Sequence, residues 1–289
     1  MTRPRAMLLI LAGGTAMSFV GLLMRLMETS GGFQILFWRS ISLAAMVLAV
    51  ACVERRCRPA TFLRSLDRAD LAMGAALSLA FTTYVFAMLM TSVASTLFIL
   101  TSTPFLTALI GWVWIGERPR PVTWIAMAAA VLGVALMIGD GFALGRTIGN
   151  LSAIASAGFF AVMLVLARRS KKASVLGGTF LGGLLTILLG GVATFATGAS
   201  LMIGTHDIAL ALIMGAFTIG LGIALVTAGT PHVPAAEVSL LVLIESVLGP
   251  VWVWTLLGEA MTQAEITGGL IVLASVVGVI LAGRRRGGS

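Results

Sequence analysis

Long apolar stretches, separated by short polar connectors, follow one another along the whole chain. Each holds roughly 20 residues, which as a helix rising 1.5 Å per residue cross about 30 Å of hydrocarbon. A window of about 19 residues predicts ten transmembrane helices, with ends placed to within about 2 to 4 residues. They cover residues 7–27, 32–53, 69–90, 92–115, 122–138, 148–167, 175–196, 208–228, 235–257 and 264–282. An all-α integral membrane protein without a soluble domain is therefore expected.

The composition agrees with a bilayer as the solvent. Hydrophobic residues make up 59% of the 289 positions and charged residues 10%, with a mean hydropathy of +1.07. About 25% of a soluble domain is charged. The two cysteines, Cys52 and Cys57, lie at the basic end of the second span, where thiols stay reduced, so no disulfide is expected.

The basic residues lie between the apolar stretches and indicate how the chain crosses the bilayer. With the N-terminus placed in the cytoplasm, 16 of the 19 Lys and Arg residues fall on the cytoplasmic side. Arg25 and Arg146 fall outside, and Arg39 lies within a span. The positive-inside rule predicts that both termini are cytoplasmic. The expected location of this multi-pass protein is the bacterial inner (plasma) membrane. The expected partners are the lipid bilayer and a small-molecule substrate, and no nucleic acid, because the net charge of +8 is accounted for as a topology signal.

The chain contains an internal repeat. A shift of 142 positions lays the Trp-x-x-x-Gly-Glu segment of residues 112–117 over the same pattern at 254–259, and both segments end an apolar stretch. Because each half holds five spans, an odd number, the second copy enters the membrane upside down. Accordingly, Arg118 and Arg120 follow the first segment, and no basic residue follows the second. This pattern predicts two inverted five-helix repeats, residues 1–141 and 142–289, around a central cavity. Shared membrane composition is the alternative explanation of these matches.

Four short motifs carry a resemblance to a known family: Phe37-Trp38-Arg39-Ser40, Thr103-Pro104-Phe105, Gly116-Glu117 and Gly258-Glu259. In their order and in the five-plus-five plan, the chain resembles EamA-type members of the drug/metabolite transporter superfamily over nearly its whole length. Among these it looks most like the YddG exporters of aromatic and other neutral amino acids. The resemblance implies a central cavity lined by helices one, three, four, six, eight and nine. One departure is Glu245-Ser246, which stands where the first copy has Thr103-Pro104, so the two halves of a site are not chemically equivalent.

Glu245 is the most informative single residue, because it lies near the centre of the span 235–257. An isolated acid at this depth costs about 2.5 to 3.5 kcal/mol on insertion scales, so its side chain is expected to face a cavity or a partner. Three roles remain open at this point. The carboxyl group could receive a substrate ammonium, carry a coupling proton, or form a structural hydrogen bond to a neighbouring helix.

Three further charged residues are assigned to gating or to structure. Arg39 lies about seven residues inside the outer end of its helix, where pairing with a helix end or an acid is favoured over binding a substrate carboxylate. Glu117 and Glu259 are interfacial and are expected to cap neighbouring helices or to form gates.

Polar and adaptable side chains at helical spacing supply the remaining candidates. Those for substrate binding, besides Glu245, are Thr15, Ser18, Ser78, Thr82, Tyr84, Thr101, Ser102, Ser156, Phe159 and Met163. Pro104 and Pro250 are the predicted hinges, since each removes a backbone donor within a span. Close helix packing is the alternative explanation for the hydroxyl groups.

The residues favour a carrier over other classes of membrane protein. The chain has no Gly-x-x-x-x-Gly-Lys-[Ser/Thr] loop for ATP, and His206 and His232 are its only histidines, so an enzyme, a metal site and a cofactor are not expected. A channel would need a ring of charge or a carbonyl filter. The prediction is a secondary transporter that exports small metabolites, amino acids above all, by alternating access. A broad-specificity exporter of drugs or nucleoside-like metabolites is the alternative, and a channel or an intramembrane enzyme is a remote one. A monomer is expected, with an oligomer as the alternative.

Overall fold

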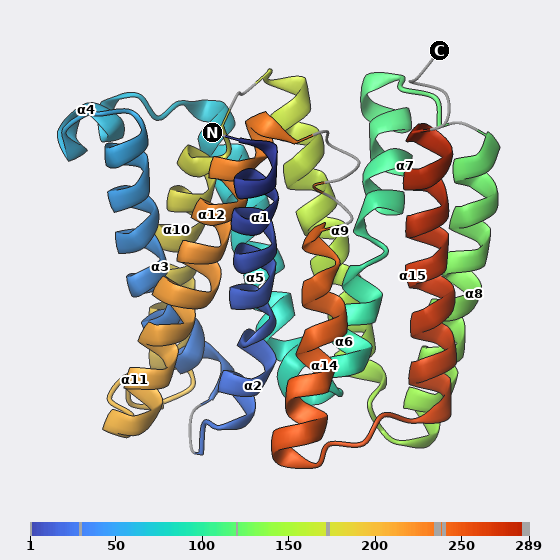
Figure 1. Cartoon of the computed structure of the whole chain (residues 1–289). Coiled ribbons are helices and arrows are strands. Elements are labelled where there is room, and N and C mark those ends of the chain that lie inside the picture. Colours follow the sequence, from blue (N-terminus) through green and yellow to red (C-terminus); the bar gives the residue numbers. More distant parts are fainter. Residues whose placement is uncertain are drawn as a thin grey trace.

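The computed structural model describes residues 2–28, 31–119, 121–171, 174–233, 238 and 241–284. The regular elements within these ranges are all helices, and most of them stand side by side in one bundle (Figure 1). In this part of the chain, nine helical segments are long and apolar enough to cross a membrane. The predicted span 235–257 falls partly outside the described residues, and its described portion contains the apolar helix Ile244–Leu257. The chain is a multi-pass membrane protein.

The elements follow one another along the chain with short connections. In order they are α1 (Arg3–Ser18), α2 (Val20–Arg25), α3 (Gly32–Glu54), α4 (Pro59–Arg64), α5 (Arg68–Met90), α6 (Val93–Leu100), α7 (Thr103–Ile115), α8 (Pro121–Ala143), α9 (Thr147–Arg169), α10 (Leu176–Ala196), α11 (Thr205–Ile213), η1 (Met214–Gly220), α12 (Leu221–Gly229), η2 (Thr230–His232), α14 (Ile244–Leu257) and α15 (Gln263–Arg284).

Several predicted spans are divided in the structure. The first span consists of α1 and α2, which meet at Phe19, and the span predicted at 92–115 consists of α6 and α7. The span predicted at 208–228 contains the π-helix η1 between α11 and α12. The short helix α4 was not predicted, because six residues are far shorter than the window that finds a span. Its Phe62 is buried against Phe180 of α10, with ring centroids 5.7 Å apart.

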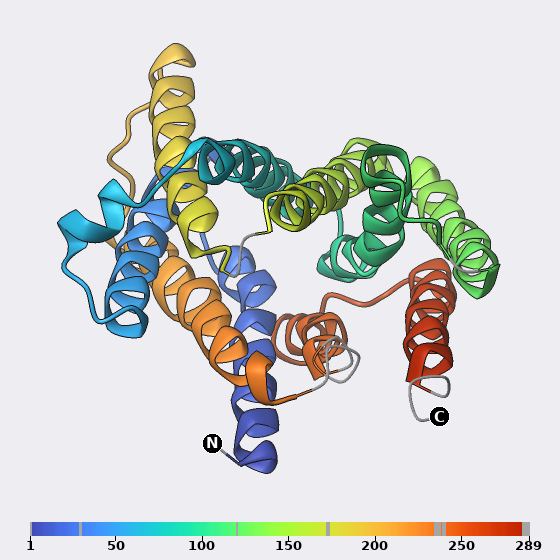
Figure 2. The ribbon, with the colours of Figure 1, turned by 90° about the horizontal axis from the view of Figure 1, so that it is seen from above.

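The helices pack in pairs, and each pair joins an early helix to a late one. α5 packs against α9, α3 against α10, α8 against α15, and α1 against α12. Seen from above, the α8–α15 pair lies at one side of the bundle and α4 at the other (Figure 2). In the α8–α15 pair, a Cβ atom on Gly133 would lie 2.6 Å from the Gly268 carbonyl oxygen, and one on Gly268 would lie 2.5 Å from the Gly133 carbonyl oxygen. The two backbones touch there, which only glycine permits.

Two helices end in glycine turns of the same kind. α7 ends at Gly116 with φ 77°, and α14 ends at Gly258 with φ 70°, a left-handed conformation that costs glycine nothing. The amide of Gly116 donates to the Trp112 carbonyl at 3.1 Å, and that of Gly258 donates to the Trp254 carbonyl at 3.0 Å. The two turns lie at opposite ends of the bundle (Figure 1).

Two helix breaks occupy matching positions in the chain. The turn between α6 and α7 is at Thr101 and Ser102, and α14 begins after a turn at Leu243. Thr101 and Leu243 are separated by the same 142 positions that relate the two glycine turns. A hinge at Pro104 within one continuous helix was expected. Instead Pro104 lies in the first turn of the separate helix α7, where its missing backbone donor costs nothing.

Candidate functional site

A cavity of about 560 Å³ lies inside the bundle and is lined mainly by apolar side chains. Its wall is formed mainly by α5, α6, α7, α9 and α14 with the residues just before α14, and α1, α2, α3, η1 and α15 contribute one residue each. This volume lies within the range of about 300–1,000 Å³ that is usual for small-molecule sites.

The cavity reaches one end of the bundle. Arg168, close to the end of α9, belongs to its lining, and the Arg168 side chain is 57% exposed. Its guanidinium group lies 3.3 Å from the carboxylate of Glu117, in the connection after α7. This exposed pair is worth little energetically and lies at the end of the bundle where α1 begins (Figure 1).

At the opposite end, Arg25 of α2 holds three segments together. Its Nε donates to Glu259 at 2.7 Å, and its two terminal nitrogens donate to the carbonyls of Met88 at 2.6 Å and Thr91 at 2.7 Å. Glu259 in turn accepts a hydrogen bond from the amide of Val93, the first residue of α6, at 3.0 Å. Glu259 therefore caps α6 and also binds the end of α2.

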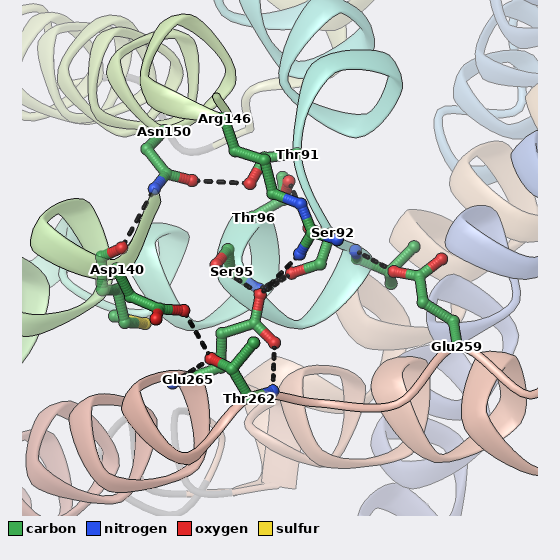
Figure 3. A network of polar contacts seen from close by, with 12 residues as sticks. Thr91, Ser92, Ser95, Thr96, Asp140, Arg146, Asn150, Glu259, Thr262 and Glu265 are labelled. Carbon is green, nitrogen blue, oxygen red and sulfur yellow. Dashed lines mark hydrogen bonds and ion pairs between the residues drawn. The ribbon is translucent and has the colours of Figure 1, made fainter. Parts of the chain in front are cut away.

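Glu265 forms a second closure at the same end (Figure 3). Its carboxylate is 2% exposed and accepts hydrogen bonds from the Ser92 hydroxyl, from the Ser95 hydroxyl at 3.0 Å and from the Thr262 amide at 2.9 Å. Arg146 approaches it at 3.5 Å. These contacts join the starts of α6, α9 and α15, so this end of the bundle is held closed.

The network extends into α8 and α9. The Thr262 hydroxyl donates to Asp140 at 2.7 Å, and the Thr91 hydroxyl donates to Asn150 at 2.7 Å. Sequence reasoning missed Glu265, Asp140 and Asn150, because polar residues at helix ends are ordinary in a membrane protein. The one available signal was Glu265, which lies inside the predicted span 264–282.

The structure places some of the predicted site residues on the cavity wall. These are Arg39, Tyr84, Thr101, Pro104, Ser156 and Glu245. Glu245 is the second residue of α14 and forms no hydrogen bond or ion pair with the described residues. The Ser156 hydroxyl is already used, because it donates to the Ala80 carbonyl at 2.9 Å.

The other predicted binding residues and the second predicted hinge lie away from the wall: Thr15, Ser18, Ser78, Thr82, Ser102, Phe159, Met163 and Pro250. Several of their hydroxyls are used in packing. Ser18 donates to the Thr15 carbonyl at 2.6 Å, and Ser78 accepts from Thr186 at 3.0 Å. Pro250 is inside α14 and lines a small recess beside Glu259.

The two helix breaks meet at the cavity. The Thr101 hydroxyl donates to the Ser246 hydroxyl at 2.9 Å, which links the α6–α7 turn to the start of α14. The Thr103 hydroxyl donates to the Leu100 carbonyl at 2.5 Å and so satisfies an acceptor that Pro104 cannot reach. Irregular backbone at membrane depth is tolerated where it is buried in protein or lines a cavity.

Arg39 differs from the other arginines of the site. Its side chain is fully buried, and its Nε, Nη1 and Nη2 atoms have no hydrogen-bond partner among the described residues. The expected partner, a helix end or an acid, is therefore not found in this part of the structure. The guanidinium carbon lies 5.1 Å from the centre of the Phe81 ring.

The comparisons with known proteins agree with this architecture. The model of the EamA-like transporter family matches residues 4–139 and matches again over residues 147–281. The chain belongs to the EamA-like transporter family. This confirms the predicted place in the drug/metabolite transporter superfamily and makes the chain a membrane transporter of small molecules. The particular resemblance to the YddG exporters stays a prediction.

The comparison with solved structures gives the fold alone. A crystal structure titled only as that of a "protein" superposes with a TM-score of 0.70 at 18% sequence identity, covering 98% of this chain and 100% of that chain. The comparison with curated proteins gives no match.

Proposed function

We propose that the chain is a secondary transporter of the bacterial inner membrane that exports amino acids, aromatic and other neutral ones, by alternating access. The observation that carries this proposal is the cavity. It contains both helix breaks, is open toward the Arg168 end and is closed at the Arg25 end. A carrier needs a site that is exposed to one side at a time, and this arrangement provides one.

The helix pairing supports an inverted repeat with halves at residues 1–141 and 142–289. If the halves are related by a two-fold axis in the membrane plane, the α5–α9 pair becomes the α12–α1 pair. The same two-fold axis maps the α3–α10 pair onto itself and the α8–α15 pair onto itself. The observed pairs α5–α9, α1–α12, α3–α10 and α8–α15 support this arrangement. The two glycine turns at opposite ends and the two separate family matches support the same division.

In this proposal the halves rock about the cavity while the turns at Thr101 and Leu243 absorb the bending. The Arg25 and Glu265 contacts break when the outer end opens, and the cavity then closes at the Arg168 end. Both termini are proposed to be cytoplasmic, which makes the Arg168 end the inner one. The chain is proposed to work as a monomer.

Counterflow in proteoliposomes tests the function. Proteoliposomes that contain the purified protein are loaded with unlabelled L-phenylalanine. They are expected to accumulate external labelled phenylalanine transiently and with saturation, because a carrier exchanges one solute molecule for another. A panel of other neutral amino acids, nucleosides and cationic drugs defines the substrate range. Exchange of nucleosides or drugs alone would replace the amino-acid proposal by a broad-specificity exporter, which the apolar wall also favours. Non-saturating flux without counterflow would indicate a channel.

A further inference from the structure

The guanidinium group of Arg39 is buried beside the cavity without a counter-ion in the described structure. Three other arginines, at the cavity or at the ends of the bundle, are paired with acids: Arg25 with Glu259, Arg146 with Glu265, and Arg168 with Glu117. With the described residues, Arg39 forms neither an ion pair nor a hydrogen bond from any of its three side-chain nitrogens. A buried charge that is left unpaired destabilises the fold, so its retention indicates a partner that is not part of these residues.

The position of Arg39 is fixed by packing on both its backbone and its side chain. A Cβ atom on Gly215 of η1 would overlap the Arg39 carbonyl oxygen, so α3 and η1 are in direct backbone contact at this point. On the side-chain side, the guanidinium group lies over the Phe81 ring, and both Arg39 and Phe81 line the cavity. Packing thus fixes the Arg39 backbone and places its guanidinium group at the cavity wall, with its three nitrogens buried there.

The cavity also holds one acid. Glu245 and Tyr84 both line the wall. Glu245 and Arg39 have not combined into an ion pair with each other. Among the described residues, the mainly apolar wall thus carries Arg39, Glu245 and Tyr84, and Arg168 adds a second arginine at the exposed end.

We infer that Arg39 binds the carboxylate of the transported solute, an inference that rests on the proposed transport function. A carboxylate offers two oxygens in a plane, which matches the paired donors of a guanidinium group. Glu245 then receives the ammonium group, and the apolar wall receives the side chain. Arg39 is accordingly a specificity-determining residue: a solute without a carboxylate leaves its donors unpaired.

Three probes that share one ring and differ in charge test this inference: L-phenylalanine, phenethylamine, which lacks the carboxylate, and 3-phenylpropionate, which lacks the ammonium group. Binding is measured on purified protein at one pH. Arg39→Met is expected to weaken binding of phenylalanine and phenylpropionate by about 10- to 100-fold and to change phenethylamine binding by less than about threefold. Arg39→Lys keeps the charge but loses the planar fork, so it should recover part of the loss.

Arg168→Met is the matched control, since it removes another cavity-lining arginine whose partner is exposed. It is expected to leave the ratio of phenylalanine to phenethylamine affinity unchanged. An equal loss of all three probes in Arg39→Met and Arg39→Lys would overturn the carboxylate assignment, as would wild-type protein that prefers phenethylamine. Either result would leave the transport function intact if counterflow of any solute is observed. Absence of counterflow for every solute would contradict the transport function itself.

Discussion

Arg25→Met is expected to open the closed end of the bundle. The substitution removes the ion pair with Glu259 and the hydrogen bonds to the carbonyls of Met88 and Thr91. Hydrogen bonds to charged groups contribute about 1.5–3 kcal/mol each. Because these bonds belong to the closed end, the loss of even one favours the opposite state by roughly 10- to 150-fold.

A cysteine in place of Ala94 reports this change. Ala94 is 3% exposed and lines the recess beside Glu259, so a membrane-impermeant thiol reagent on that side should reach it slowly. With Cys52 and Cys57 replaced by Ser, labelling is expected to be at least about tenfold faster when Arg25→Met is added. Arg168→Met, which breaks a pair at the other end, should not accelerate labelling. Equal labelling rates with and without Arg25 would show that the contacts of Arg25 with Glu259, Met88 and Thr91 do not form a gate.

Glu245→Gln is expected to weaken phenylalanine binding by about tenfold or more while leaving 3-phenylpropionate binding nearly unchanged. The reason is that a charge-assisted hydrogen bond to an ammonium group is roughly twice as strong as a neutral one. Glu245 lines the cavity and has no partner among the described residues, which favours a ligand over a structural bond. Ser246→Ala, at the neighbouring cavity-lining residue, is the control and should affect both probes alike.

The same variant separates the other roles of Glu245. If the carboxyl group carries a coupling proton, Gln should retain phenylalanine affinity while net flux loses its dependence on pH. If its role is structural, both affinity and pH dependence should persist in Gln, and Glu245→Ala should fail to fold. Either pattern would contradict the ammonium assignment.

The sequence predicted the spans well because a bilayer demands about 20 apolar residues for each one. The prediction at 148–167, for example, corresponds to α9, Thr147–Arg169. Pro104 gave a correct signal of irregularity, but the sequence could not say that the chain would divide into α6 and α7 with the break at Thr101. At the break, Thr101 contacts Ser246, a residue 145 positions away that local sequence reasoning does not consider.

The site was predicted less well, for a physical reason. In a membrane bundle, both lipid and neighbouring helices are apolar, so a stripe of hydroxyls shows only that one face is more polar. It does not show whether that face meets a cavity or another helix. Ser78 meets Thr186 and Ser18 meets Trp252, whereas Thr101 reaches the cavity. Arg39 was predicted to have a structural partner for the same reason. That its side chain has no hydrogen-bond partner among the described residues follows from how the helices pack, which the sequence does not show.

The central claim is that two inverted halves surround the cavity, and cysteine labelling from each face of the membrane tests it most directly. Arg118, after α7, and Gln263, at the start of α15, are both exposed and follow the two equivalent glycine turns. In a chain with Cys52 and Cys57 replaced by Ser, Gln263→Cys should be labelled by an impermeant maleimide on intact cells. Arg118→Cys should be labelled only after the membrane is permeabilised. Labelling of both positions from the same face would contradict the inverted repeat and, with it, the alternating-access account.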